Sequence, residues 1–479
     1  MSPAEQGPNF CRSFLLQTFW PDEPPVSRAL QNIRPKELKF NPHFYLYGAP
    51  AIYAMGAAIK LGQLSGFYPN PGNITPFLKN PDYSGRLWAA PRILFALSLS
   101  LAILVLYFSV QILFGEWWGV FAAFILAASP VTAMETHILK PYLISMLCTA
   151  SMFYFLIRGK HRWAALLAGI NAAFLITSSI FAVVIGAAAL YNNGGKRAWK
   201  NVFICAVVYL IGFLGTNPLW IFSPQETISG LLSVGPPAGG IKINILSPLA
   251  WIKVWVTELP TQAGIYLAVP TAAGALAYAF KQERVVAYCL LTLLLITPML
   301  VSLRLVHYVV PSMPAVIILA IYGLRWLWRL SPVISAAAMG VGSIFMILHM
   351  TFYQLILLNV VTVQEQASQW LNSNLPTGTT IATSHLLTPA YMYPPFRMAG
   401  HKFMVKSENT YDWLAKLNRD RPRFYISISD EEITQRPDFL KLYKKEVSFE
   451  TRTSLDKLYV NELIWKKLTW PIKIYLLKV

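Results

Sequence analysis

Residues 93–114 read ILFALSLSLAILVLYFSVQILF and contain no charged side chain. A helix needs about 20 consecutive apolar residues to cross the hydrocarbon core of a bilayer, and this segment is long enough. Its apolar residues are continuous and do not alternate with polar ones, so it lacks the pattern of a strand in a transmembrane barrel. The segment therefore predicts a membrane-spanning α-helix.

The composition extends this prediction to most of the chain. Hydrophobic residues make up 55% of the 479 residues, charged residues make up 13%, and the mean hydropathy is +0.46. A soluble domain carries roughly 25% charged residues. We predict a polytopic α-helical membrane protein whose transmembrane domain covers residues 1–360. The other hydrophobic segments lie near 44–62, 117–133, 141–157, 163–190, 201–222, 262–280, 286–302, 305–323 and 333–359.

The formal net charge of +18 raises the question of nucleic-acid binding. The basic residues are scattered through short loops and a C-terminal region, without a basic helix or an aromatic RNA-binding motif. We therefore expect no nucleic-acid partner. We interpret the charge by the positive-inside rule, under which Lys and Arg concentrate in cytoplasmic loops.

Short basic loops orient the helices. The loops RGKHR (158–162) and GGKRAWK (194–200) flank one apolar stretch, so a single span would place them on opposite sides. The polar triplet Thr177–Ser179 interrupts this stretch, and we predict two half-helices that meet there and return to the same side. With KQER (281–284) and RWLWR (325–329) also cytoplasmic, the outer face carries residues 20–25, 134–142, 223–261, 304–308 and everything beyond 360.

The chain changes character after residue 360. The segment VQEQASQWLNSNLP (363–376) predicts an amphipathic helix that ends at Pro376, while GTTIATSH (378–385) and RFYISIS (423–429) are typical of strands. We predict a small extracytoplasmic α/β domain over residues 361–479.

Ionisable side chains gather at the predicted outer ends of the spans. The stretch WPDEPP (20–25) supplies two adjacent carboxylates. Ionisable groups at membrane depth usually face a cavity, although an isolated Arg or Lys can also be a snorkelling anchor. A carboxylate surrounded by cations suits a reaction in which the carboxylate removes a proton while cations hold a phosphate leaving group. The residues are Asp22, Glu23, His43, Arg86, Arg92, His137, Lys140, Arg304, His307 and Tyr308.

The order of several motifs, together with the topology, resembles the GT-C membrane glycosyltransferases. Within them it is most similar to the protein O-mannosyltransferase and aminoarabinose transferase-like group, over roughly residues 18–430. The motifs are PDE (21–23), NPHFYLYGAP (41–50), RILFAL (92–97), ASPVTAMETH (128–137), RLVHYVVPSMP (304–314) and QASQWLNSNLPTGTTIA (366–382).

The resemblance implies an inverting enzyme of the inner membrane. It would transfer a sugar from a polyprenyl-phosphate donor to a hydroxyl of a protein, lipid or glycan, on the periplasmic side. Asp22 would be the general base, supported by Glu23. The candidates for holding the donor phosphate are Arg92, Lys140, Arg304 and His307, and the candidates for lining the cavity are His43, Arg86, His137, Tyr142 and Tyr308.

The chain departs from the family pattern at three places. Tyr142 stands where relatives often carry an Asp, and Thr177-Ser178 stands where they often carry Thr-Lys. Only 19 largely polar residues precede WPDEPP, where relatives have a first transmembrane helix. We expect a start codon placed too late, with a lost helix or an exported N-terminus as alternatives.

Some GT-C enzymes use a metal ion, but we expect no obligatory metal or other cofactor here. An adjacent Asp-Glu pair without a further external acid is a poor site for a divalent cation, which needs several oxygen ligands.

Two other functions remain as alternatives. A transporter or flippase of lipid-linked sugars would also carry buried charges and half-helices, but the polar groups cluster at one face and we find no inverted repeat. A degenerate, non-catalytic GT-C scaffold is compatible with the departures at Tyr142 and Ser178.

Overall fold

The structure is a computed structural model in two compact units. Residues 28–58 and 91–353 form the helical unit, and residues 1–27, 59–90 and 354–479 form the mixed unit. The residues that the structure describes are 23–45, 47–73, 75–80, 82–191, 195–233, 252–253, 255–256, 265–280, 283–303, 306–359, 363–383, 401–405, 410–428, 431–449 and 472–478.

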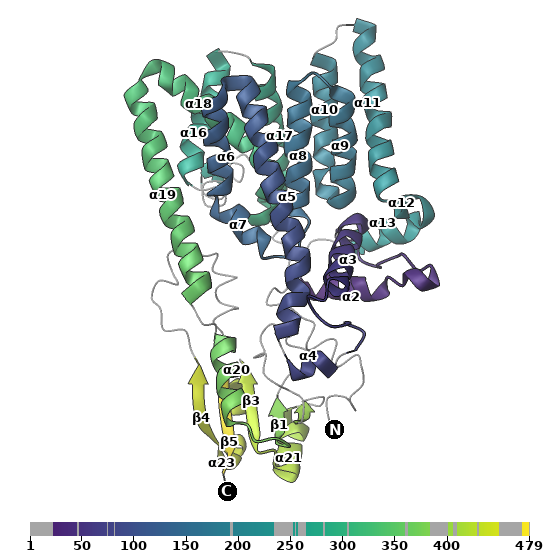
Figure 1. Ribbon diagram of the computed structural model, residues 1–479, viewed down its shortest axis with the longest axis vertical. Helices are drawn as coiled ribbons and strands as arrows, with labels where there is room; N and C mark the ends of the chain where they lie inside the picture. The colour runs from purple at the N-terminus through teal and green to yellow at the C-terminus, as the bar shows by residue number, and fades with distance from the viewer. Residues whose placement is uncertain are drawn as a thin grey trace. The chain divides into compact units, whose positions relative to one another are not determined.

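The helical unit is a bundle of apolar helices (Figure 1). The elements lying wholly or partly in it are α2 (Glu23–Asn32), η1 (Pro35–Glu37), α3 (Ala49–Leu64), α5 (Asp82–Phe114), α6 (Glu116–Ala127), α7 (Pro130–Thr136), α8 (Tyr142–Ile157), α9 (His161–Phe174), η2 (Ile176–Ser179), α10 (Ile180–Tyr191), α11 (Gly195–Thr216), α12 (Leu219–Phe222), α13 (Pro224–Ser233), α16 (Ile265–Phe280), α17 (Arg284–Leu303), η4 (Val306–Ser312), α18 (Met313–Leu330) and α19 (Pro332–Asn359).

Among the described residues, 4 helices are long and apolar enough to cross a membrane, and shorter apolar helices accompany them. The four segments are 82–114, 196–216, 308–330 and 332–351. The prediction of a polytopic α-helical membrane protein is confirmed.

The apolar stretch 163–190 is interrupted where the polar triplet predicted. Helix α9 ends at Phe174, the short η2 covers Ile176–Ser179, and α10 begins at Ile180. The helices α9 and α10 pack against each other and lie side by side (Figure 1). The chain therefore turns back at the triplet, as predicted from the two flanking basic loops.

The predicted segment 305–323 was wrong in its end, because η4 and α18 cover it and α18 continues to Leu330, through the predicted loop 325–329. Two other predicted segments are divided by a proline. The segment 117–133 is divided at Ser129 into α6 and α7, and the segment 201–222 contains the end of α11 at Thr216 and the separate α12. In both cases a proline follows the last helical turn closely, at Pro130 and Pro218. Proline disfavours a helical conformation in the residue before it, so it ends a helix that average hydropathy would continue.

Glycines allow the closest helix contacts in the bundle. A Cβ atom added to Gly169 of α9 would lie 2.1 Å from the carbonyl oxygen of Tyr209 in α11. A Cβ atom added to Gly323 of α18 would lie 2.1 Å from the carbonyl oxygen of Pro270 in α16. Small residues are common at contacts between membrane helices because packing there replaces the hydrophobic driving force.

A buried hydrogen-bond network joins α8, α9 and η2. The Ser145 hydroxyl donates to Asn171 Oδ1 at 2.5 Å and lies 2.9 Å from the Ser178 hydroxyl. Asn171 Nδ2 donates to the Thr149 hydroxyl at 2.9 Å. All four side chains are buried. The network fixes the position of α8 along α9.

We expect Asn171→Leu to destabilise the bundle by about 1 to 2 kcal/mol, because the substitution leaves buried hydroxyl groups without their amide partner. Thermal unfolding of the detergent-solubilised protein, followed by circular dichroism, measures the change. Ser145→Ala, which removes a smaller part of the network, should cost less. An unchanged unfolding temperature in Asn171→Leu would contradict the structural role of the network.

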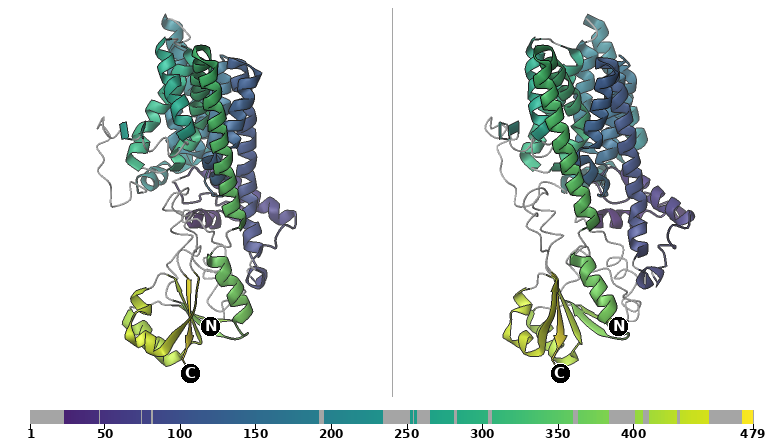
Figure 2. Two further views of the ribbon diagram at one scale, coloured as in Figure 1. Left: turned by 90° about the vertical axis from the view of Figure 1, so that its left-hand side faces the viewer. Right: turned by 60° about the vertical axis from the view of Figure 1, so that its left-hand side comes forward.

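The mixed unit contains a five-stranded sheet in the order β2-β1-β3-β5-β4. Strand β1 pairs parallel with β2 and β3, and β5 pairs antiparallel with β3 and β4. Figure 2 shows α20 on one face of the sheet and α21 with α23 on the other. The elements are α4 (Thr75–Lys79), α20 (Val363–Asn374), β1 (Thr380–Thr383), β2 (Lys402–Val405), α21 (Thr410–Asp420), β3 (Phe424–Ile428), α22 (Glu431–Thr434), α23 (Pro437–Leu442), β4 (Tyr443–Phe449) and β5 (Ile472–Leu477).

Aromatic side chains fill the core of this α/β part. Trp413 of α21, Tyr425 of β3 and Phe439 of α23 are fully buried in one cluster. The predicted helix 363–376 and the strand segments 378–385 and 423–429 correspond to α20, β1 and β3. The predicted fold class is therefore confirmed, while the predicted division at residue 360 stays a prediction.

Candidate functional site

The end of α7 and the connection to α8 contain two buried ionisable side chains. Glu135 lies in the last turn of α7 and is 1% exposed, and Lys140 lies in the connection and is 2% exposed. Tyr142, which is also buried, begins α8 directly after Pro141. Lys and Glu are almost never fully buried in proteins. Ionisable residues inside a membrane protein are rare because they are costly, and they usually mark function.

Segments distant in sequence meet at Tyr142. The Tyr142 ring packs edge to face on Tyr308 of η4 with 5.9 Å between the ring centroids. Lys140 Nζ lies 5.8 Å from the centroid of the Tyr142 ring. Tyr47, Tyr308 and Glu135 all lie near enough to interact with the Tyr142 hydroxyl. The turn, η4 and the segment before α3 thus form one polar site.

Arg92 of α5 joins this site through His137. His137 is exposed to solvent on one side, and its pKa lies below its ordinary value because partial desolvation of the ring and the nearby positive charge of Arg92 both disfavour the protonated form. Neutral imidazole therefore predominates at neutral pH. We call Arg92, Glu135, His137, Lys140, Tyr142 and Tyr308 the polar cluster.

For four of the predicted site residues the structure describes no side chain. Asp22 and Arg304 lie outside the described residues. Glu23 is the first residue of α2 and His307 lies in η4, but their side chains are not among the described ones. Their roles stay predictions.

Two further predicted residues have other contacts. The guanidinium of Arg86 lies over the ring of Tyr83 at 5.7 Å from its centroid, and its side chain is exposed. His43 has a positive φ of 50°, and its Nδ1 lies 2.5 Å from Glu226 Oε1 in α13. Asn41 Nδ2 donates to the other oxygen of the same carboxylate at 2.9 Å. The carboxylate thus joins α13 to the segment before α3.

The contact between His43 and Glu226 predicts a pH dependence. Hydrogen bonds from Tyr45 and His43 lower the pKa of Glu226. A carboxyl group with a lowered folded-state pKa stabilises the fold above its ordinary pKa, and this contribution is lost as pH falls through the lowered value. We expect about 0.2 to 1 kcal/mol from this exposed pair. Thermal unfolding between about pH 5 and pH 3 should show the loss, and Glu226→Gln should lack it. An identical profile in the variant would contradict the assignment.

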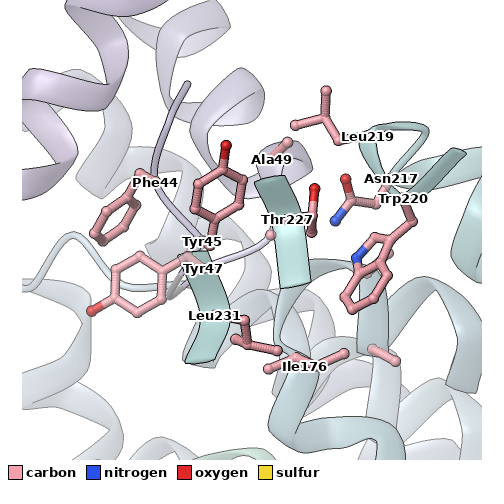
Figure 3. Close-up of a pocket in the computed structure, with 13 residues that line it drawn as sticks. Phe44, Tyr45, Tyr47, Ala49, Ile176, Asn217, Leu219, Trp220, Thr227 and Leu231 are labelled. Carbon is pink, nitrogen blue, oxygen red and sulfur yellow. The ribbon is translucent and has the colours of Figure 1, made fainter. Parts of the chain in front are cut away.

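A small pocket lies beside Tyr47, enclosed by the segment before α3, α12 and α13 (Figure 3). Its cavity volume is about 20 Å³, which is room for one water molecule. Figure 3 shows Asn217 and Thr227 on one side and the tyrosines on the other, with the Tyr47 hydroxyl directed away from Asn217. Within the described part of the chain, the buried Oδ1 of Asn217 has no hydrogen-bond partner. The pocket fits a water molecule bound to Asn217 and is too small for a sugar.

Glu135 is a site residue that the sequence analysis missed. It stands in the quoted motif ASPVTAMETH, two residues before His137, in a turn already assigned to the outer face. Glu135 is thus a further acid, beside Asp22 and Glu23, on the predicted outer face. Among the described residues, no group of three His, Cys, Asp or Glu side chains could hold a metal ion. That no metal is obligatory stays a prediction.

Comparisons with known proteins identify the fold. Residues 85–222 match the family model of dolichyl-phosphate-mannose-protein mannosyltransferases. The structure is similar to ArnT from Cupriavidus metallidurans in the apo state, with a TM-score of 0.52 and 13% identity, over 98% of this chain and 93% of that chain. The chain has the GT-C glycosyltransferase fold. ArnT bound to undecaprenyl phosphate gives a TM-score of 0.52 and 12% identity, over 97% and 95% of the two chains. No curated protein matches the sequence of this chain.

The predicted resemblance to the GT-C superfamily is confirmed by this fold together with the family match. Five members of the polar cluster, from Arg92 to Tyr142, lie within the matched residues 85–222, and Tyr308 lies beyond them.

Proposed function

We propose that this protein transfers a sugar from a polyprenyl-phosphate donor to an acceptor hydroxyl on the periplasmic side of the inner membrane, with inversion. The polar cluster carries this proposal, because it gathers two cations, a carboxylate and an imidazole at one end of a GT-C bundle. A fold relative with bound undecaprenyl phosphate supports a donor of this class.

In this mechanism the cations Arg92 and Lys140 hold the donor phosphate. Sugar transfer breaks the bond between the anomeric carbon and the phosphate oxygen, and negative charge develops on that oxygen. Lys140 is buried, so its charge acts at a low local dielectric and interacts more strongly than it would in water. Tyr142 lies beside Lys140 and packs on Tyr308, and a tyrosine hydroxyl can donate a hydrogen bond to a phosphate oxygen.

Asp22 would act as the general base, with Glu23 supporting it. It would take the proton of the acceptor hydroxyl while the acceptor oxygen attacks the anomeric carbon from the face opposite the phosphate. The electron pair of the broken bond leaves with the polyprenyl phosphate. Attack from the opposite face gives the inverted product.

Glu135 would balance the cations before the donor arrives. A buried charge is costly unless an opposite charge is nearby, and Glu135, five residues before Lys140, is buried like it. Two cations against one carboxylate leave one positive charge, which the single negative charge of a phosphodiester donor would neutralise.

Reconstituted proteoliposomes containing undecaprenyl-phosphate-linked mannose or undecaprenyl-phosphate-linked aminoarabinose test the proposed function. If the protein is the proposed enzyme, undecaprenyl phosphate is released. The sugar is then found either bound to an acceptor or, after transfer to water, free in solution. Movement of the intact sugar lipid between leaflets without release would instead establish the transporter, and binding without either event would establish the scaffold. A crude membrane extract as the acceptor source avoids a choice among protein, lipid and glycan.

A further inference from the structure

A second polar site lies at the other end of α8. Helix α8 begins at Tyr142 in the polar cluster and ends at Ile157, about 24 Å away along a helix of this length. There the loop before α9 and the side of α11 line a cavity of about 550 Å³ that is open to the outside of the bundle. This is large enough for the headgroup of a lipid, and the charge pattern assigns this loop to the cytoplasmic side.

The cavity is strongly basic. Lys160, His161 and Arg162 line it from the start of α9, and Asn201 lines it from α11. The sequence contains no Asp or Glu between Glu135 and Glu226. Among the described residues, no carboxylate forms an ion pair with Lys160 or Arg162.

His161 adds a group that points to a ligand. Its Nδ1 atom is buried and has no hydrogen-bond partner within the described part of the chain. A buried polar atom without a partner is uncommon and calls for a partner from outside the protein. An anion with several acceptor oxygens, such as a phosphate, would satisfy this nitrogen and both cations.

Apolar groups continue from the cavity along α11. Trp163, which stacks on Phe155 with 6.2 Å between the ring centroids, and Ile204 lie beside the cations. Tryptophan is enriched where membrane proteins meet the lipid headgroups. Beside and beyond Ile204, α11 carries exposed apolar side chains, namely Phe203, Val207, Leu210 and Ile211. A soluble phosphate compound has no acyl chains and would not contact these apolar side chains.

We propose that this cavity binds the phosphate headgroup of an anionic phospholipid from the cytoplasmic leaflet, with its acyl chains along α11. Basic pockets between membrane helices on the cytoplasmic side recognise lipid phosphates in this way. The site is separate from the polar cluster and does not depend on sugar transfer.

Native mass spectrometry of the full-length protein, purified in detergent and incubated with equal amounts of phosphatidylglycerol and phosphatidylcholine, tests the proposal. The wild-type protein should retain more phosphatidylglycerol than phosphatidylcholine. The variant Lys160→Gln/Arg162→Gln should lower this retention about tenfold or more, since each cation near the membrane surface contributes appreciably to anionic lipid binding. The matched control is Lys196→Gln/Arg197→Gln, which removes two charges from the first turn of α11 outside the cavity lining and should retain the lipid.

Three results would overturn the proposal. Equal retention of both lipids by the wild type would exclude headgroup recognition. An equal loss in the control would indicate general attraction to a basic surface. Displacement of the lipid by millimolar glycerol 3-phosphate would assign the cavity to a soluble phosphate. If the double variant aggregates, the single variant Arg162→Gln, at an exposed residue, decides the same question.

Discussion

The variant Asp22→Asn should lose about 10³-fold in sugar transfer and still bind undecaprenyl phosphate like the wild type. Asparagine has nearly the same shape as aspartate but cannot accept the proton of the acceptor hydroxyl. The cations that would hold the phosphate remain in place, so donor binding should not change. Release of undecaprenyl phosphate from a labelled sugar donor measures turnover, and tritiated undecaprenyl phosphate measures binding.

Asp438→Asn is the matched control, because it makes the same chemical change at an exposed residue of α23. It should transfer sugar like the wild type. Full turnover in Asp22→Asn would reject Asp22 as the base. Loss of phosphate binding together with turnover would instead assign Asp22 a structural role.

Lys140→Met should weaken the binding of undecaprenyl phosphate by about 10- to 100-fold, because a hydrogen bond to a charged group contributes about 1.5 to 3 kcal/mol. Methionine has an unbranched apolar side chain only one heavy atom shorter than that of lysine, and it removes the charge. Lys140 is 2% exposed. In the variant, bulk water therefore does not solvate the donor phosphate in place of the lost ammonium group. A direct binding measurement in detergent gives the effect without any choice of sugar or acceptor.

Lys36→Met is the control, because it removes the same charge from an exposed residue of η1. It distinguishes a direct contact of Lys140 with the phosphate from attraction by the net positive charge of the protein. We expect less than a threefold change in this control. A similar loss in both variants would show that Lys140 acts only through net charge. The unfolding temperature of each variant checks that the bundle remains folded.

Much of the bundle could be predicted from sequence because lipid imposes a simple rule on helices. Residues 93–114 lie within α5, and the turn at Thr177–Ser179 follows from two basic loops that had to share one side. The ends of α6 and α11 could not be found from hydropathy, since apolar residues continue past Ser129 and Asn217. Backbone restrictions at the next proline, which hydropathy ignores, ended those helices.

For the candidate site, the sequence could propose residues but not their contacts. Topology assigned Arg92, Lys140 and Tyr308 to one face, but only the fold shows which of them meet. The contact between Tyr142 and Tyr308 joins residues far apart in sequence, and so does the pairing of His43 with Glu226. Glu135 was overlooked because a single acid in a short turn is usually a solvated surface residue, and only its burial distinguishes it.

The buried network of Ser145, Thr149, Asn171 and Ser178 has a consequence for how the protein fits its membrane. It fixes the register of α8, whose two ends carry the polar cluster and the loop of the basic cavity. The two polar ends lie on one continuous helix, so their separation is set by its length of about 24 Å. A thinner or thicker bilayer has to adapt to the protein through its own deformation or through tilt of the whole bundle. We therefore expect the length of α8 to limit how far the bundle adjusts to bilayers of different thickness.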